Sequence, residues 1–333
     1  MRKGTVNKTV QSVRRGKGVL GLTAGLIGTG MLISQAQAAA SLDPYYQASP
    51  VRLDFSFGLE EMTGDLTSSV GGEINYADGT SEATFFPISE LEWPMDIMLA
   101  RFDGSLVLNP LWRINGTVKT ALDDPEENMI DRDWFSPGGP ADIYSESDIS
   151  SFDAFILDVD LEWTYFLLGP WSLSAGIGYL RQEFEYEGDL IIQYSPASIA
   201  GYNYIGNGST AITYDNTFSM FYLLLGANMQ LTPQLDFSGK FSLAPFAASE
   251  DELHHLSSDK VSTGDMDGVA CMFEMSGNFR ITPWWFVKAG VQLAYISVDG
   301  DQHQALAGEP LGRIEQEVES NQSSAYISMG YSF

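Results

Sequence analysis

Apolar and polar residues alternate with a period of two along most of this chain, which predicts β-strands with two chemically different faces. Between positions 51 and 59 the odd positions are all apolar, and the even positions carry Arg, Asp, Ser and Gly. The same alternation returns over 153–167, 269–281 and 285–295. After the first forty residues no run of about eighteen apolar residues could form a membrane-spanning helix. We therefore expect an all-β fold.

Proline marks the ends of the predicted strands, because it removes a ladder donor and favours a turn. Four short turns of this kind are expected at 108–111, 168–171, 231–234 and 281–284. Long polar connections lie between them, at about 62–84, 122–151, 188–214, 249–267 and 299–319. The pattern predicts ten strands, with five long loops at one end and four short turns at the other.

This asymmetry favours a transmembrane antiparallel β-barrel over a soluble β-sandwich, whose turns are of similar length at both ends. Aromatic residues near the strand ends agree with an outer-membrane barrel: Trp112, Trp163, Trp171, Trp284, Trp285 and Tyr331. Only a closed ring satisfies every backbone donor in lipid. The last strand, 325–333, alternates and ends on Phe, which resembles the signal read by the barrel-assembly machinery. A narrow barrel is filled by side chains, so function is expected in the extracellular loops rather than in a pore.

The first forty residues are typical of a secretory signal peptide. A basic leader precedes the small apolar stretch 19–33, and Ala36-Gln37-Ala38 follows it. A transmembrane anchor is the alternative, but fifteen residues are short for a span. We expect cleavage near Ala38 or Ala40 and a mature barrel over 41–333, exported to the outer membrane of a Gram-negative cell.

The mature chain is strongly acidic. Removing residues 1–40 leaves 11 Lys and Arg against 44 Asp and Glu, a formal net charge of −33. This charge argues against a nucleic-acid partner, because binding phosphates needs clustered basic residues. The single cysteine excludes a disulfide framework and a Cys-rich zinc site, and we expect no metal and no cofactor.

Strand phase directs four candidate residues towards the barrel axis. If the phase of the strand at 112–118 continues, Asp131 and Asp133 face inward, about 6–7 Å apart along the chain. If the phase of the strand at 235–243 continues, Glu252 and His254 face inward. A carboxylate beside a histidine can orient the ring, and two further carboxylates can hold a water. Such a group could activate water for attack on a carbonyl.

The residue types alone leave other interpretations open. In a chain with 44 acidic residues an Asp-x-Asp pair also fits a solvated loop, and a single bulge would reverse the phase and turn His255 inward. A non-catalytic barrel, acting as an adhesin or as a surface structural protein, is the alternative function. A narrow channel is a third interpretation, against which the charged lumen argues.

Three motifs resemble the omptin family of outer-membrane endopeptidases: 128–134 (Asn-Met-Ile-Asp-Arg-Asp-Trp), Glu146-Ser147, and 89–93 (Ser-Glu-Leu-Glu-Trp). The resemblance implies peptide-bond hydrolysis by a water held between an Asp-x-Asp pair and an Asp-x-His couple, without a covalent intermediate. Asp131 and Asp133 match the pair. His254 matches the histidine, with Glu252 where the family has Asp.

The resemblance also implies a substrate site and a lipid partner. Ser147 falls where the family has a serine at the rim of the site, and Glu250 could supply an acidic pocket for basic substrate residues. Family members bind lipopolysaccharide through basic residues, but Glu183 stands at one such position, which leaves that requirement in doubt. We expect an aspartic-type endopeptidase with its site facing the cell exterior, acting on cationic peptides.

Overall fold

The structure is a computed structural model that describes residues 51–333, and the regular elements in this range are all β-strands. Within it, no helix has the length and hydropathy that crossing a membrane requires. The predicted signal peptide, residues 1–40, lies outside the described residues and stays a prediction. The strands are β1 (Arg52–Tyr76), β2 (Ser81–Ala83), β3 (Ser89–Pro94), β4 (Ile97–Asn109), β5 (Trp112–Ala121), β6 (Met129–Asp133), β7 (Ile143–Leu168), β8 (Trp171–Tyr194), β9 (Tyr204–Ile205), β10 (Thr210–Thr232), β11 (Leu235–His255), β12 (Lys260–Arg280), β13 (Trp285–Leu306) and β14 (Glu309–Ser332).

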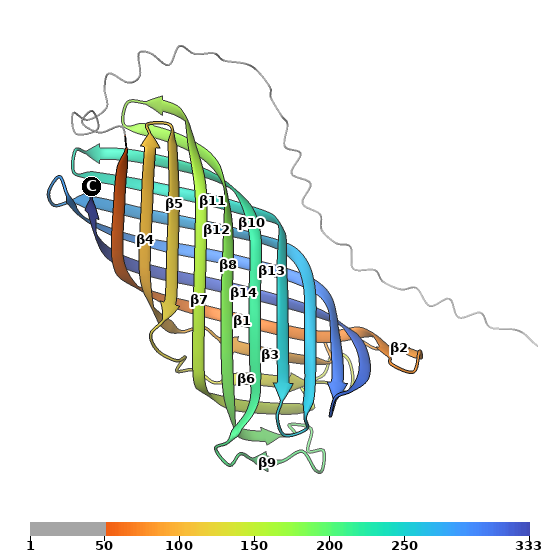
Figure 1. Ribbon diagram of the computed structural model, residues 1–333. Coiled ribbons are helices and arrows are strands. Elements are labelled where there is room, and N and C mark those ends of the chain that lie inside the picture. Colours follow the sequence, from red (N-terminus) through yellow and green to blue (C-terminus); the bar gives the residue numbers. More distant parts are fainter. Residues whose placement is uncertain (1–50) are drawn as a thin grey trace, which may run out of the picture. The chain divides into compact units, whose positions relative to one another are not determined.

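Ten of these strands pair into a closed antiparallel ring (Figure 1). The order around the ring is β1, β14, β13, β12, β11, β10, β8, β7, β5 and β4, which returns to β1. The first and last strands pair from Asp54 opposite Ser332 to Tyr76 opposite Gly312. The ring therefore leaves neither terminal strand with an open edge, as a sheet in lipid requires.

The four short turns lie where proline predicts them, between β4 and β5, β7 and β8, β10 and β11, and β12 and β13. The predicted long loops are mostly strand instead. β11 continues to His255 and β12 begins at Lys260, while only two residues separate β13 from β14. These predicted loops are polar because the strands extend beyond the apolar band, where neither face needs a hydrophobic surface. Their polar composition does not indicate irregular structure.

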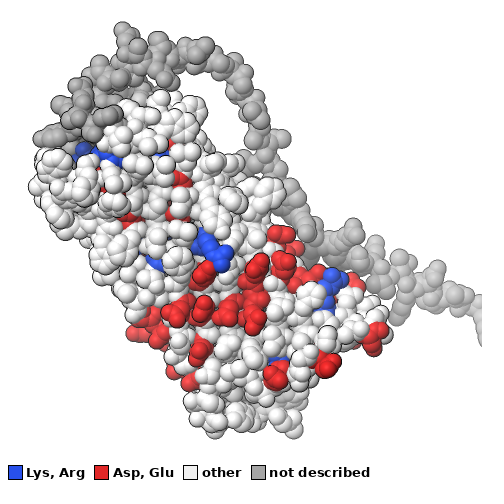
Figure 2. Space-filling model, viewed as in Figure 1, with Lys and Arg blue, Asp and Glu red and all other residues white. Residues whose placement is uncertain are grey.

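The outer surface divides into an apolar part and an acidic part. Large apolar side chains such as Phe55, Phe102 and Leu225 are exposed on the halves of the strands near the short turns. Acidic side chains gather over the opposite halves, nearer β6 and β9 (Figure 2). Trp112 and Trp163 stack at the short-turn end with ring centroids 6.4 Å apart. This distribution is that of an outer-membrane barrel, with an aromatic girdle at one boundary.

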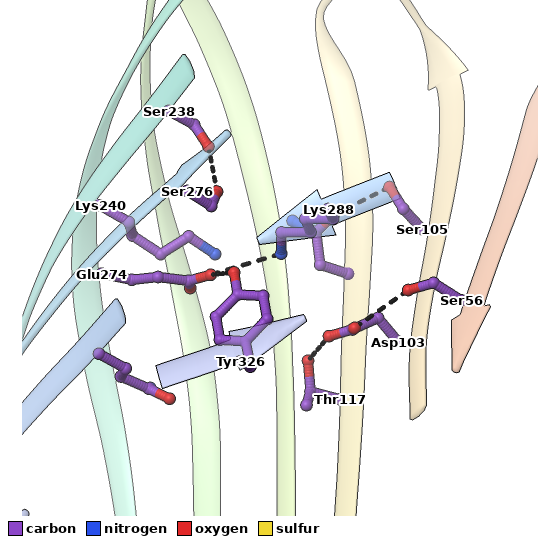
Figure 3. A network of polar contacts seen from close by, with 12 residues as sticks. Ser56, Asp103, Ser105, Thr117, Ser238, Lys240, Glu274, Ser276, Lys288 and Tyr326 are labelled. Carbon is purple, nitrogen blue, oxygen red and sulfur yellow. Dashed lines mark hydrogen bonds and ion pairs between the residues drawn. The ribbon is translucent and has the colours of Figure 1, made fainter. Parts of the chain in front are cut away.

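Paired charges fill the inside of the ring (Figure 3). Glu60 accepts hydrogen bonds from Arg101 and Lys119, both at 2.6 Å, and Lys240 contacts Asp160 at 2.6 Å. Tyr326 donates to Glu274 at 2.5 Å, and the Arg101 guanidinium lies 3.8 Å from the centre of the Tyr326 ring. These contacts join strands that are one to three positions apart around the ring, and they fill the lumen with paired polar groups.

Candidate active site

The short strands β3 and β6 build one wall above the β4–β5 hairpin. β3 pairs with β1, β6 pairs with β7, and β3 and β6 pair with each other, so they continue the ring beyond the point where β5 ends. Residues 122–128 form the connection, which Asp123 and Asp124 hold by accepting hydrogen bonds from the backbone N–H groups of Met98 (2.6 Å) and Phe152 (2.7 Å). In β6, as in β5, the odd-numbered residues therefore face the interior.

Asp131 and Asp133 share the inward face of β6 with Met129, which is buried in the core. Arg132 occupies the opposite face and forms ion pairs with Glu90 at 2.9 Å and Glu92 at 2.8 Å. The two aspartates thus point to the interior together, as strand phase predicts, and the ion pairs hold β6 against β3.

An aromatic layer closes the interior on the short-turn side of this pair. Trp93 of β3 is 0% exposed, and its ring centroid lies 5.1 Å from that of Tyr214 on β10 and 5.0 Å from that of Tyr186 on β8. Tyr186 donates a hydrogen bond across the ring to the carbonyl of Pro94 at 3.2 Å. The buried rings exclude water from this part of the interior, and the resulting low dielectric constant strengthens electrostatic interactions next to the layer.

Burial and mutual repulsion dominate the electrostatics of the aspartate pair. Burial, followed by the charge of Asp133, raises the pKa of Asp131 to about 8, and burial also raises the pKa of Asp133. Ser89 opposes the second shift through a hydrogen bond to Asp133. The Oδ1 atom of Asp131 is buried and accepts no hydrogen bond within residues 51–333. The pair therefore takes up protons at a higher pH than ordinary carboxyl groups do, and it retains an oxygen that can receive a ligand.

The opposite wall differs from its predicted phase because β11 contains a bulge. Around Pro245 and Phe246, two residues of β11 stand against one residue of β10 and one of β12, so β11 contains one extra residue, and Phe246 is 82% exposed. Proline has no N–H for the ladder, so it favours a bulge in a strand. Beyond the bulge the odd positions face inward.

The predicted inward orientation of Glu252 and His254 is therefore wrong, and Glu250 lies on the same outer face. Asp251 faces inward: it is 6% exposed and accepts hydrogen bonds from Tyr214 at 3.0 Å and from Gln316 of β14 at 2.7 Å. The bond from Gln316 crosses the ring, which establishes the phase of the segment. Glu250 and Glu252 lie exposed on the outer face, and the imidazole of His254 lies 3.5 Å from Asp259.

His255 and Lys260 take the inward positions at the end of this hairpin. They face each other across β11 and β12, in register with buried Leu253 opposite Ser262. Burial and the charge of Lys260 lower the pKa of His255 to about 4, so its imidazole is uncharged at neutral pH. Lys260 also acts electrostatically on both Asp131 and Asp133. The hairpin end and the β6 wall thus face the same space.

Ser147 of β7 lies inward at 2% exposure, opposite Met129 and one inward position nearer the short turns than Asp131. The sequence did not indicate Asp251, Lys260 or Ser89 as residues of the site, and it indicated His255 only as an alternative to His254. Pro245, inside an otherwise regular strand, is the signal that could have identified Asp251 and His255. Residues 51–333 contain no group of three or more His, Cys, Asp or Glu side chains arranged to hold a metal ion.

Comparisons with known proteins agree with this architecture. The model of the Omptin family matches residues 58–329. The crystal structure of the outer membrane protease OmpT from Escherichia coli superposes with a TM-score of 0.68 at 17% sequence identity, covering 86% of this chain and 98% of that chain. The outer membrane protein OprG from Pseudomonas aeruginosa covers 85% of this chain and 95% of its own at 10% identity, but its TM-score of 0.38 carries no argument. A search of curated proteins found no match.

Proposed function

The chain belongs to the omptin family and is an outer-membrane β-barrel protein, and from this premise we propose that it hydrolyses peptide bonds at the cell surface. The wall formed by β6 and the end of the β11–β12 hairpin lie at the end of the ring opposite the short turns. In an outer-membrane barrel the short turns are periplasmic, so this end faces the exterior. The substrate then approaches from outside the cell.

The observation that carries the proposal is the half-buried aspartate pair on the inward face of β6, whose pKa values are raised. A catalytic acid or base works best when its pKa is near the operating pH, and two carboxyls that share one proton supply both roles. The ionised carboxylate removes a proton from water as the water oxygen attacks the peptide carbonyl carbon. The protonated carboxyl donates its proton to the carbonyl oxygen. When the C–N bond breaks, a proton passes from the pair to the leaving nitrogen.

His255, rather than His254, is the histidine of the proposed site. It is inward, uncharged at neutral pH and opposite Lys260, which acts on the aspartate pair. A neutral imidazole can donate one hydrogen bond and accept another, so it can orient the attacking water. Its lowered pKa makes it a weaker base than the aspartate pair. We therefore assign it a positioning role and assign proton removal to the pair.

A preference for basic substrate residues is supported by Asp251 rather than by Glu250. Asp251 presents its carboxylate to the interior, and burial raises its pKa to about 6, so it is mostly charged at pH 7. The acidic outer surface, visible in Figure 2, also attracts cationic peptides over a range that salt shortens. No observation favours the alternative of a non-catalytic adhesin. An adhesin would not need the inward-facing pair of Asp131 and Asp133.

The test is cleavage of a dibasic peptide by folded, detergent-purified protein carrying Asp131→Asn, His255→Ala or His254→Ala. We expect Asp131→Asn and His255→Ala to lower kcat by about 100-fold or more, the range of a lost acid–base or positioning group. His254→Ala should lower it much less. Retained heat-modifiable migration on SDS gels controls for folding. Full activity in Asp131→Asn would reject the proposed chemistry, and a larger loss in His254→Ala than in His255→Ala would reject the assigned histidine.

A further inference from the structure

A buried hydrogen-bonded bridge crosses the interior between β14 and β11. The Nε2 atom of Gln316 donates to Asp251 Oδ2 at 2.7 Å and to the Oγ atom of Ser68 on β1 at 3.0 Å. Tyr214 of β10 also donates to Asp251 Oδ2, at 3.0 Å. Gln316 is 2% exposed and Asp251 is 6% exposed, so both side chains are removed from water. Four strands therefore contribute to the hydrogen bonds of one carboxyl group and one amide group.

The second oxygen of the Asp251 carboxyl and the amide oxygen of Gln316 are left without donors. Asp251 Oδ1 and Gln316 Oε1 are buried, and within residues 51–333 neither accepts a hydrogen bond of normal geometry. The two atoms lie side by side against Gly264 of β12. They are 2.3 Å and 2.2 Å from the position that a Cβ atom on this glycine would take. Two neighbouring buried acceptors repel each other, and each is destabilising while it lacks a donor.

A proton on Asp251 removes this conflict. A protonated carboxyl group has an O–H donor beside an acceptor oxygen, and a primary amide has an N–H donor beside an acceptor oxygen. Placed edge to edge, the two groups form a ring of two hydrogen bonds. The bond from Gln316 Nε2 to Asp251 Oδ2 is present, and a proton on Asp251 Oδ1 supplies the bond to Gln316 Oε1. Turning the amide over does not help an ionised carboxylate, because one oxygen–oxygen contact remains in either orientation.

We propose that Asp251 and Gln316 form a cyclic acid–amide pair that binds one proton, and that a basic side chain of the substrate competes with this proton for Asp251 Oδ1. The competition rests on the proposed function, whereas the pair itself does not. When the proton leaves, Oδ1 is a charged acceptor without a donor, and a substrate ammonium or guanidinium group supplies one. Burial raises the pKa of Asp251 to about 6, against the opposing effect of the hydrogen bonds that it accepts.

The side chains packed around Asp251 bring no opposite charge to it. The inward-facing side chains of the neighbouring strands are Tyr214 and Asn216 of β10, Ser262 and Met266 of β12, Gln302 of β13, Gln316 of β14 and Ser68 of β1. On β11 itself, the inward positions hold Ser249, Leu253 and His255. Further inward ionisable groups at this end of the ring are Lys260, Tyr186, Asp131 and Asp133. Within residues 51–333 no ionisable group other than Tyr214 is a hydrogen-bond or ion-pair partner of Asp251. The charge of Asp251 therefore depends on its own proton and on a ligand from outside.

The proton is tested by NMR titration of folded, detergent-purified full-length protein with ¹³C-labelled Asp and Gln side chains. Asp251→Asn and Gln316→Met identify the two signals. We expect the Asp251 carboxyl signal to change with a midpoint near pH 6. The Gln316 carbonyl signal should change with the same midpoint, because its Oε1 atom loses an O–H donor.

Asp251→Asn provides the permanently neutral form of the pair. Two amides placed edge to edge keep both hydrogen bonds at every pH, so the Gln316 signal should stay constant in this variant. An Asp251 midpoint near the ordinary value of about 4 overturns the pair. A Gln316 signal that does not follow the titration of Asp251 in the wild-type protein overturns it as well.

The competition is tested by the KM for a dibasic peptide between about pH 5 and about pH 8. The KM of the wild-type protein should rise by about 10-fold at the acidic end, because one pH unit below its midpoint only about a tenth of Asp251 is ionised. Asp251→Asn should have a high KM that does not change over this range. The kcat also changes with pH because the aspartate pair titrates, so KM is the measured quantity.

Asp265→Asn is the matched control, since it removes an exposed carboxylate from the outer face of β12 beside Gly264. Its KM should depend on pH as that of the wild-type protein does. A wild-type KM that is independent of pH overturns the competition. If the wild-type protein cleaves no peptide, the proposed function fails, and the NMR titration still decides whether Asp251 and Gln316 hold a proton.

Discussion

At the scale of single residues, function and stability oppose each other at Asp131. Its pKa is about 8 in the folded protein against an ordinary value of 3.8, because it is buried beside Asp133. A carboxyl with a raised pKa contributes its full stability only below its unfolded pKa, and this contribution is lost as the pH rises towards the folded pKa. The site therefore destabilises the fold increasingly as the pH rises from about 4 to about 8, and the full destabilisation remains at higher pH, which is a common cost of a functional site.

Asp131→Asn should consequently stabilise the folded protein at pH 8 but not at pH 4. The expected gain is roughly 2–4 kcal/mol, from about 1.4 kcal/mol for each unit of pKa shift with allowance for the shared proton. Urea unfolding in lipid vesicles at both pH values measures it. Asp148→Asn, which removes an exposed charge from β7, is the control and should change neither midpoint appreciably. A loss of stability at pH 8 in Asp131→Asn would contradict the interpretation.

At the scale of strands, a single extra residue in β11 determines which side chains reach the site. The bulge at Pro245 and Phe246 turns Asp251 and His255 inward and Glu252 and His254 outward. A one-residue slip exchanges the two faces of a strand, so the segment beyond the bulge depends on it entirely. The bulge thus controls which side chains form the site, although the bulge itself lies outside the site.

Deleting Phe246 should remove the extra residue and reverse the phase of 247–255. Leu253 would then face solvent, and Glu250 and Glu252 would face the buried interior, so we expect little folded protein by heat-modifiable migration on SDS gels. Deleting Ser257, in the turn between β11 and β12, leaves the phase of both strands unchanged and should preserve folding. If the protein lacking Phe246 folds and cleaves peptide normally, the bulge does not determine the site.

At the scale of the whole molecule, the acidic excess forms rows of like charge across neighbouring strands. Asp153 of β7 lies opposite Glu185 of β8, Glu185 lies opposite Asp215 of β10, and Asp215 lies opposite Glu252 of β11. Like charges directly opposite each other on a sheet are destabilising. Salt screens exposed charges, so the half of the ring farther from the short turns should gain stability as ionic strength rises.

The urea midpoint should therefore increase between about 50 mM and about 500 mM NaCl, across which the Debye length falls severalfold. Asp215→Asn, which interrupts the row at its centre, should reduce this dependence. Choline chloride should act like NaCl if the effect is screening. A midpoint independent of salt would show that the rows cost no measurable stability.

The sequence alone determined the all-β fold, the apolar parts of the strands and the short turns that join them. Alternation is a local property, and prolines end strands locally, so the short turns, the inward aspartates of β6 and the inward direction of the lumenal charges could all be derived from single segments. The polar halves of β11 to β14 were assigned to loops because a strand with two hydrated faces has no apolar signature. The resemblance of residues 128–134 to the omptin family is confirmed by the family match over 58–329.

Only the tertiary structure decided which residues of β11 face the interior. Whether His254 or His255 faces inward depends on the register of β11 with β10 and β12. That register is a property of three strands rather than of one. The hydrogen bond from Gln316 to Asp251 depends on ring closure, which brings together residues 65 positions apart in the chain. Local patterns specify the face of a strand, whereas the partner across the interior is specified by how the whole ring closes.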